Sequence, residues 1–394
     1  MELSPQQALG LRMSSLLLRA SSGGADRTTG VAEVVAWLGA MQAQDLASGL
    51  WSFGARLPGN TAADVTAALE RREALRTWPM RGTIHFVPSR DARWMLELMG
   101  VRVLNGAARR REQLGLSEET AVQAMDVLGA ALAGGGRLSR SECLAALAEK
   151  GIDTGGQRGY HLLWYASQRG LLCIAPNIGN EQSFVLLDEW VPDPHRPERD
   201  EALGTMALRY FRGRGPTTRQ DFAGWTGLTA ADAKRGIAVA GDALARVTVD
   251  GVETYVDAAL LDTAPPPAGD DEVLVLPGFD EYLLGYKDRS LMVADEHKAA
   301  IIPGGNGVFR STVVRAGRVV ATWTRTLTKS GVRIAVQPLS PLGGSERAEV
   351  ERAFEPYARF MERTPEVRWP WSSRAMAPAQ VISREGRRII WWGR

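Results

Sequence analysis

Apolar residues recur at helical spacing through the middle of the chain and then give way to two short strand-like runs. Three helices are predicted there, over residues 117–132, 142–149 and 157–169. Ser117 and Ser139 stand where helix caps are expected. Two strands follow, at 171–175 and 183–187, joined by turn formers. Three helices followed by a hairpin is the pattern of a winged helix, a variant of helix-turn-helix.

The same order of elements is predicted on either side of this middle unit. After a proline-containing linker, helices are expected over 201–211, 218–225 and 229–238, with strands at 243–249 and 253–256. A less regular copy opens the chain, with helices over 5–19, 31–41, 47–57 and 61–71 and strands at 75–78 and 83–87. The pattern therefore indicates one structural theme used three times.

After three consecutive prolines at 265–267, the pattern of the sequence changes from mainly helical to mainly strand-like. Strands are predicted at 272–276, 309–315, 319–325 and 332–336, and a closing helix at 346–361. Ala316-Gly317 is a tight-hairpin signal between two of these strands. We therefore expect an α+β chain with three tandem winged-helix domains, over 1–115, 116–190 and 200–262, and a β-rich C-terminal subdomain over 268–394.

Composition is that of an ordinary globular protein, with 45% hydrophobic and 23% charged residues among 394. No apolar run is long enough for a membrane span, and the N-terminal residues lack a signal-peptide pattern. Cys143 and Cys173 lie in apolar surroundings, which favours buried thiols in a reducing cytoplasm. The net charge of +2 does not mark a nucleic-acid binder. Arginine greatly outnumbers lysine. This excess reflects either a coding bias or the use of planar guanidinium groups to bind phosphate.

Gln42 and Gln44 are the candidate catalytic pair. Residues two apart diverge on a helix but share a face in an extended segment. The pair falls between two predicted helices, and Asp45 is placed to cap the second helix. The alternative is a pair of solvated glutamines at a helix end.

The chemistry of two amides is restricted. Amides do not titrate, so they cannot act as general acids or bases. They can orient a water molecule and direct carbonyl dipoles at a developing cation. That is sufficient only for a leaving group that departs without protonation, such as a purine that is already cationic because it is alkylated at N7.

Three segments carry a resemblance to a known family. Residues 41–45 (MQAQD), 78–85 (WPMRGTIH) and 276–282 (LPGFDEY) resemble the bacterial winged-helix DNA glycosylases, the AlkZ-like family of azinomycin-resistance type. The resemblance implies Gln42 and Gln44 as the catalytic signature, and a concave cradle of winged helices with a hairpin that contacts DNA. It also implies excision of bulky N7-alkylguanine adducts and, in some members, unhooking of interstrand crosslinks.

Candidate DNA contacts are basic or polar residues near the predicted hairpins. They are Arg81, His85, Arg110, Asn306, Arg310 and Arg325. Arg81 would meet a phosphate, and His85 a phosphate or the lesion. For these two, structural roles inside a hairpin are equally compatible with the sequence, whereas a solvated charge run is the simpler interpretation of Arg110.

Several activities are not indicated by the sequence. It lacks a phosphate-binding loop for ATP, a serine-hydrolase elbow and histidines at metal spacing, and Gly213-Arg214-Gly215 does not make a dinucleotide site. We therefore predict a monofunctional DNA glycosylase, without metal or nucleotide cofactor, that acts as a monomer on double-stranded DNA with alkylated purines. The alternatives are a non-catalytic DNA-binding or drug-sequestering protein, including a transcription regulator, and a family member recruited to another hydrolysis.

Overall fold

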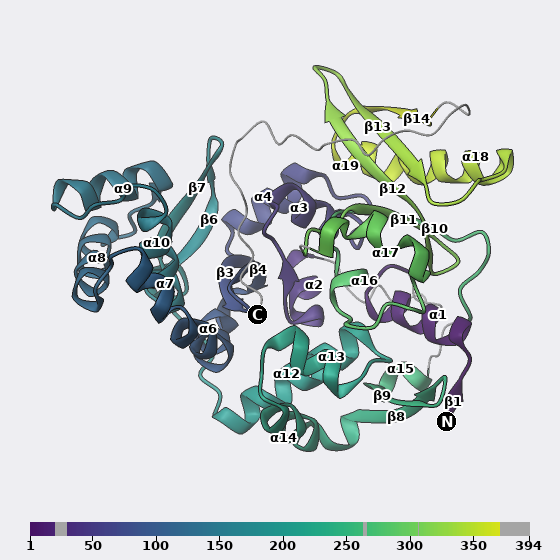
Figure 1. Ribbon diagram of the computed structural model, residues 1–394, viewed down its shortest axis with the longest axis horizontal. Coiled ribbons are helices and arrows are strands. Elements are labelled where there is room, and N and C mark those ends of the chain that lie inside the picture. Colours follow the sequence, from purple (N-terminus) through teal and green to yellow (C-terminus); the bar gives the residue numbers. More distant parts are fainter. Residues whose placement is uncertain (20–29, 263–265, 306, 371–394) are drawn as a thin grey trace.

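Figure 1 shows the computed structural model of the protein, whose described residues form helices and three β-sheets. The structure describes residues 1–394 except for 20–29, 263–265, 306 and 371–394. Helices and strands are mixed along the chain, as the sequence predicts. Within the described ranges, no helix is long and apolar enough to cross a membrane.

The front of the chain forms four helices close to their predicted ranges. They are α1 (Pro5–Ser15), α2 (Val31–Leu38), α3 (Leu46–Gly54) and α4 (Ala62–Glu70). Helix α2 ends at Leu38 rather than at the predicted Met41, because Gly39 takes a φ of 76° and turns the chain. Asp45 then accepts the Ser48 N–H and caps α3, which confirms the predicted cap.

Strands of the front and middle units join into one six-stranded sheet, in the order β2-β4-β3-β6-β7-β5. Their bounds are β2 (Met41–Gln42), β3 (Ala74–Met80), β4 (Thr83–Pro88), β5 (Leu138–Ser139), β6 (Leu172–Ile178) and β7 (Glu181–Leu186). The sequence does not predict this join, which is made by a single pair, Arg76 with Ile174. The buried Arg76 guanidinium reinforces it by donating to the Ala175 carbonyl and to Asn177 Oδ1.

Short helical segments connect the front unit to the middle unit. They are η1 (Ser89–Asp91), α5 (Ala92–Met95), the π-helix η2 (Leu96–Gly100), α6 (Val101–Gly106) and α7 (Ala108–Gln113). The middle unit has α8 (Glu118–Leu132), α9 (Arg140–Glu149), α10 (Arg158–Gln168) and α11 (Leu187–Trp190). Ser117 and Ser139 cap α8 and α9, as predicted. This unit stands to one side of the molecule (Figure 1).

The next unit contains α12 (Arg199–Arg214), α13 (Arg219–Thr226), α14 (Ala230–Ala240), η3 (Gly241–Ala243), β8 (Leu244–Val249), β9 (Val252–Asp257) and α15 (Ala259–Asp262). Its sheet is completed from the other end of the chain. Strand β1 (Glu2–Leu3) runs parallel to β8, with Leu3 opposite Val249. The first residues of the chain thus pack against a unit that begins almost two hundred residues later, which the sequence pattern does not reveal.

The C-terminal unit is built on a five-stranded sheet, β10-β11-β12-β13-β14. The strands are β10 (Val273–Leu276), β11 (Ser311–Arg315), β12 (Arg318–Leu327), β13 (Gly331–Pro338) and β14 (Thr364–Arg368). The helices are α16 (Glu281–Leu284), η4 (Asp295–His297), α17 (Lys298–Ile301), η5 (Pro303–Gly305), α18 (Gly344–Ala353) and α19 (Glu355–Phe360). Ala316 and Gly317, with φ of 49° and 77°, form the predicted tight turn.

The predicted closing helix over 346–361 is wrong in one respect, because it is two helices. Pro356 lies at the start of α19, where its missing N–H costs nothing, whereas within one continuous helix it would remove a hydrogen bond. The chain therefore breaks at Phe354 and restarts.

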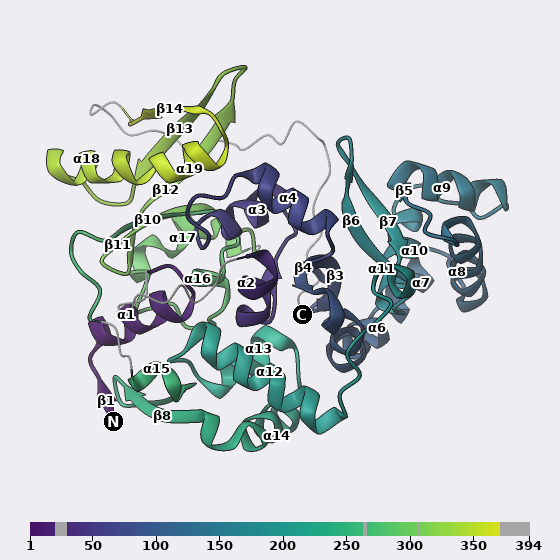
Figure 2. The ribbon, with the colours of Figure 1, turned by 180° about the vertical axis from the view of Figure 1, so that it is seen from behind.

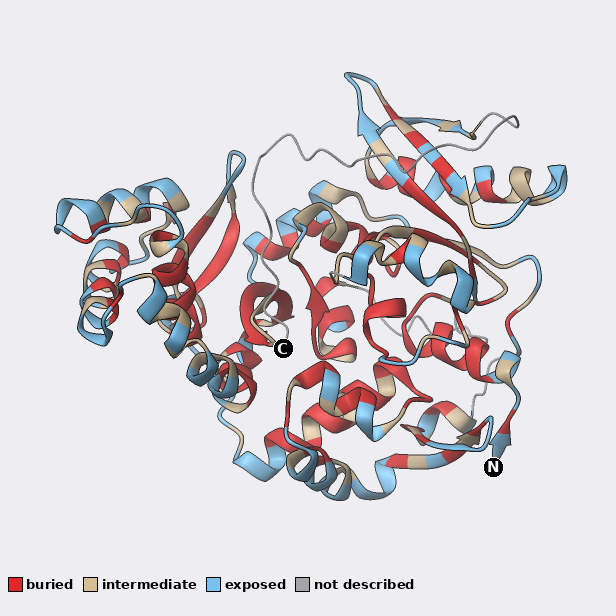
Figure 3. Cartoon of the chain, viewed as in Figure 1, coloured by how far each residue is buried: buried red, intermediate tan, exposed pale blue. Residues whose placement is uncertain are grey.

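Buried residues form a nearly continuous band through the centre of the molecule (Figure 3). Cys143 and Cys173 are both buried, in different parts of the core, and burial raises the pKa of the Cys143 thiol to about 12. This confirms the prediction that both thiols are buried. Strands β3 and β4 lie in the middle of the molecule, between α2 and the β6–β7 hairpin, in both views (Figures 1 and 2).

Candidate active site

Three polar side chains form a row across strands β2, β4 and β3. Gln42 is paired with His85, and His85 is paired with Thr77. Directly paired residues in antiparallel strands project from the same face of a sheet. All three residues are buried, with exposures of 4%, 0% and 0%. Among the described residues, Gln42 Nε2 and Thr77 Oγ1 have no hydrogen-bond partner, although buried polar atoms normally have one.

Gln42 and Gln44 lie in an extended segment between two helices, as predicted. Gln42 ends strand β2, and the Ala43 N–H continues the pairing by donating to the Ile84 carbonyl at 2.8 Å. Helix α3, which follows this segment, packs closely against strand β4. A Cβ added to Gly49 would stand 2.7 Å from the Phe86 ring, so only glycine permits this approach.

Main-chain hydrogen bonds fix both amide groups. Gln42 Oε1 accepts the N–H of Gln44 at 3.0 Å, and Gln44 Oε1 accepts the N–H of Ile84 at 3.1 Å. An amide NH₂ could not face those donors, so both carbonyl orientations are determined by the backbone. Each oxygen keeps a second lone pair. The buried Gln42 NH₂ has no acceptor among the residues that the structure describes.

His85 is electrically neutral in this site. Burial, with a smaller contribution from the Arg81 charge, lowers the His85 pKa to about 3. Nδ1 donates to the Thr83 carbonyl at 2.9 Å, so Nε2 carries the lone pair and lies 3.4 Å from Arg81 Nη2. His85 therefore cannot serve as a general acid near neutral pH.

Arg81 stands at the turn between β3 and β4 in a strained backbone conformation. Its φ is 53°, in a region that disfavours side chains, and Gly82 follows at 70°. Burial lowers the Arg81 pKa, an effect that the nearby Glu281 carboxylate opposes. The Arg81 Nε has no partner among the described residues. A guanidinium held in this way retains unused capacity for an anion.

Glu281 connects the Gln42 segment to the rest of the protein. One carboxylate oxygen accepts the Gln42 main-chain N–H at 3.0 Å. The other accepts Arg214 Nη2 at 2.6 Å and the Trp225 indole N–H at 2.9 Å. Arg214 and Glu281 are 0% and 1% exposed as side chains, so the pair is fully desolvated. Only good geometry makes such a pair favourable, and here each charge has several hydrogen bonds.

Arg214 also binds the main chain just before Gln42. Its Nη1 donates to the Leu38 carbonyl at 2.8 Å, and its Nη2 donates to the Ala40 carbonyl at 2.9 Å. Together with the bond from Gln42 to Glu281, these contacts fix the end of α2, the turn after it and strand β2. The geometry of the glutamine pair is therefore imposed by residues from α12 and from the start of α16.

Asp280 provides a second buried ion pair beside the first. It binds Arg56 through both oxygens, at 2.8 and 3.0 Å, and also accepts the Ser52 hydroxyl at 3.0 Å. The pair ties α3 to the loop before α16. Asp280 and Glu281, which are neighbours in the sequence, thus form ion pairs with two different arginines.

Sequence reasoning gave no role to Arg214 or Glu281. A signal was present in Gly213-Arg214-Gly215, where the glycines allow close packing. A Cβ on Gly213 would stand 3.0 Å from Leu38, and one on Gly215 only 2.4 Å from the Phe211 carbonyl. These glycines bring the arginine against the Gln42 segment instead of forming a dinucleotide site.

The structure brings together Gln42, Gln44, Arg81 and His85, whereas the other predicted site residues lie elsewhere. Arg110 is on α7 and donates to Gln157 Oε1 at 2.8 Å. Arg325 is on β12 and donates to the Tyr357 hydroxyl at 2.7 Å. Arg310 precedes β11 and is half-buried. Asn306 lies outside the described residues.

In the ranges that the structure describes, no three His, Cys, Asp or Glu side chains are grouped to hold a metal ion.

Comparisons with known proteins identify the class to which this fold and site belong. A sequence model of the family described as DNA glycosylase AlkZ-like matches residues 35–360. The interstrand DNA cross-link repair glycosylase of Streptomyces sahachiroi is 30% identical over 264 residues, which cover 63% of this chain and 70% of that protein. The solved structure of the Streptomyces sahachiroi DNA glycosylase AlkZ superposes with a TM-score of 0.75 and 26% identity, over 94% of this chain and 100% of that one.

The protein is thus a DNA glycosylase, a hydrolase that acts on N-glycosyl bonds. Within that class, the chain belongs to the AlkZ-like family, since the family match extends over most of its length. The resemblance noted in three short segments of the sequence is confirmed.

Proposed function

We propose that the protein hydrolyses the N-glycosyl bond of bulky cationic N7-alkylguanine adducts in double-stranded DNA. One observation carries the proposal: the candidate site pairs two amides with a histidine that burial keeps neutral. None of these groups can protonate a leaving base near neutral pH. The substrate must therefore be a base that already carries positive charge, and N7 alkylation of guanine provides that charge.

Gln42 and Gln44 would act on the sugar and on water. Loss of a cationic base leaves an oxocarbenium-like sugar, which the remaining carbonyl lone pairs would stabilise. The unpartnered Gln42 NH₂ would hold the attacking water, which then releases its proton to solvent. Because the backbone fixes both amides, little reorganisation is needed during reaction.

DNA would be held by basic groups on several elements. Arg81 would contact a phosphate next to the lesion, with His85 beside it. Further contacts would come from Arg110, Asn306, Arg310 and Arg325. Three winged-helix domains with the C-terminal β-rich subdomain would form the surrounding cradle, and the enzyme would work as a monomer without metal or nucleotide cofactor.

The named relative suggests a more specific role. That protein is described as an interstrand DNA cross-link repair glycosylase. We extend this to the present chain as unhooking of crosslinks made by a bifunctional alkylating antibiotic, which would give self-resistance. Two N7-alkylguanines joined by one linker are each cationic, so excision of either base follows the same chemistry.

Release of free base tests the proposal. A duplex with one bulky N7-alkylguanine is incubated with the wild type and with the Gln42→Ala, Gln44→Ala and Gln123→Ala variants, the last altering an exposed glutamine on α8. We expect loss of a catalytic amide to slow excision by about a hundredfold, and Gln123→Ala to match the wild type.

Two results would count against this proposal. Binding without base release by the wild type would support the rival, a non-catalytic DNA-binding or drug-sequestering protein. Undiminished excision by both amide variants would remove Gln42 and Gln44 from the mechanism.

A further inference from the structure

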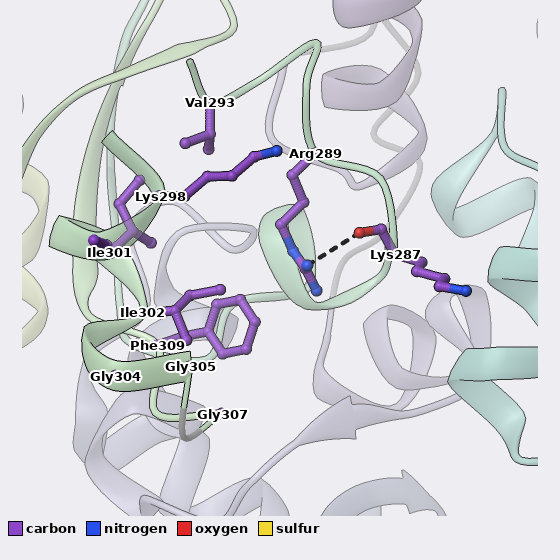
Figure 4. Close-up of a pocket in the computed structure, with 11 residues that line it drawn as sticks. Lys287, Arg289, Val293, Lys298, Ile301, Ile302, Gly304, Gly305, Gly307 and Phe309 are labelled. Carbon is purple, nitrogen blue, oxygen red and sulfur yellow. Dashed lines mark hydrogen bonds between the residues drawn. The ribbon is translucent and has the colours of Figure 1, made fainter. Parts of the chain in front are cut away.

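A cavity of about 520 Å³ lies beside helix α17, apart from the polar row (Figure 4). Cavities of roughly 300–1,000 Å³ are typical of small-molecule sites. Its wall includes Val293, Ile301, Ile302 and Phe309 on the apolar side and Arg289 and Lys298 on the basic side. We call these six residues and the space between them the α17 pocket.

The apolar side of the α17 pocket is rigid. Val293, Ile301 and Phe309 are 2%, 1% and 8% exposed, and all belong to the hydrophobic core. The Arg289 guanidinium lies 4.9 Å from the centre of the Phe309 ring. Arg289 Nε donates to the Leu283 carbonyl at 2.6 Å, which holds that stacked position. The result is a fixed surface suited to an apolar or flat group.

The basic side faces into the same space. Figure 4 shows Arg289 and Lys298 extending toward the space from different segments, whereas Lys287 turns its ammonium group away. Lys298 is paired with Asp295 at 2.6 Å, but the two side chains are 50% and 84% exposed. Exposed ion pairs of this kind contribute only about 0–1 kcal/mol, so an anion can replace the carboxylate. None of the described residues that line the pocket is acidic.

The α17 pocket adjoins the framework of the polar row. Gly278 contacts both, because a Cβ there would lie 2.8 Å from the Phe309 carbonyl and 3.6 Å from Ser48 Oγ. Ser48 is in the first turn of the helix that Asp45 caps. Arg289 is also near enough for its charge to add to the effect of burial in lowering the Arg81 pKa. Gly278 and Arg289 thus connect the wall of the pocket to the residues around Gln42 and Arg81.

We propose that the α17 pocket receives the apolar, aromatic part of the alkyl group carried by the damaged base, while Arg289 and Lys298 face the adjoining DNA phosphate. This inference rests on the proposed function and names what makes an adduct a good substrate. A phosphate alone would need no apolar wall of this size. A methyl adduct would leave the pocket empty and gain nothing from it.

Filling the α17 pocket tests the inference. Ala299 lines it but is exposed, so Ala299→Trp occupies space without disturbing the core. Ala148→Trp, at an exposed position on α9, is the matched control. Single-turnover excision is measured on duplexes with N7-benzylguanine and N7-methylguanine. We expect Ala299→Trp to slow benzyl excision about tenfold, which corresponds to about 1.4 kcal/mol, and to leave methyl excision and the control unchanged.

Other outcomes separate the pocket from the proposed function. Equal slowing of both substrates, or none of either, overturns the pocket assignment while excision itself stands. If the wild type excises neither base, the proposed function fails, and the pocket is judged by binding instead. Ala299→Trp must then weaken affinity for the benzyl duplex alone, or the pocket assignment is rejected.

A second variant covers the case in which Ala299→Trp does not fold. Ile302 lines the pocket and is only partly buried, so Ile302→Ala removes an apolar contact with limited damage to the core. The ratio of benzyl to methyl excision should fall about threefold or more, for the loss of roughly one contact of this size. An unchanged ratio contradicts the inference.

Discussion

The main-chain N–H of Gln42 donates to Glu281 Oε1 at 3.0 Å, across 239 positions of the sequence. The same carboxylate binds the buried Arg214. The main chain of Gln42, a candidate catalytic residue, is thus anchored to an ion pair that is buried away from water. This arrangement explains how a two-residue strand keeps a defined geometry, since so short a strand has little stability of its own.

Replacing Glu281 by glutamine tests this support. Arg214 would remain buried without its counter-charge, and breaking one partner of a buried pair costs about 3–5 kcal/mol. We expect Glu281→Gln to lower the free energy of unfolding by that amount in urea denaturation, and to slow excision in the fraction that remains folded. The exposed Glu355, paired with Arg359 on α19, gives the control Glu355→Gln, which should change stability by less than about 1 kcal/mol.

The buried His85 makes stability depend on pH. Its pKa falls from 6.5 to about 3 on folding, so between these values the unfolded chain binds a proton that the folded protein does not. Stability attributable to His85 is therefore complete above about pH 6.5 and decreases as the pH falls, by up to about 1.4 kcal/mol per unit. In His85→Asn, where the amide can still donate to Thr83, urea unfolding should lose less stability between pH 7.5 and 5.5 than in the wild type.

A second histidine behaves in the same direction and provides a check on the first. Burial lowers the His161 pKa to about 4. A double variant with His85→Asn and His161→Asn should therefore show a flatter pH dependence than either single variant. An identical pH dependence in wild type and His85→Asn would contradict the assignment of His85 as neutral.

Arg81 is expected to contribute one phosphate contact. Each such contact adds about 0.9 to the slope of log affinity against log salt concentration for duplex DNA. Arg81→Gln should reduce that slope by about this amount, whereas Arg359→Gln, an exposed position on α19, should not. Measuring affinity at several salt concentrations separates the two cases. An unchanged slope in Arg81→Gln would leave Arg81 with a purely structural role.

Asp45 adjoins the glutamine pair and caps α3. Asparagine caps helices about as well as aspartate but lacks the charge. If capping is its whole role, Asp45→Asn keeps the excision rate within about threefold, and Asp45→Ala lowers stability by about 1 kcal/mol. A fall of a hundredfold in Asp45→Asn, with stability unchanged, would instead place its charge in the reaction.

The parts of the fold that local chemistry controls were predictable from the sequence. The capping residues Ser117 and Ser139 stand before helices in the structure as expected. The extended segment at Gln42 was predictable for the same reason, because it falls between two helical patterns. Pro356 was the missed local signal, since it restarts the closing helix.

Contacts between distant segments were not predictable. Nothing near Leu3 indicates its pairing with Val249, and nothing near Arg76 indicates Ile174. Arg214 and Glu281 are 67 residues apart and look unremarkable in their own surroundings. The assembly of the candidate site depends on such pairs, so the sequence indicated the candidate residues but not what holds them.

The chain order of these contacts has a consequence during synthesis. Gln42 emerges from the ribosome early, yet its supports Arg214, Trp225 and Glu281 emerge much later. A nascent chain that ends before residue 281 contains both glutamines without the groups that set their geometry. If the glutamines act as we propose, the enzyme becomes competent only when most of the polypeptide has been made, and truncated products of translation would not excise bases.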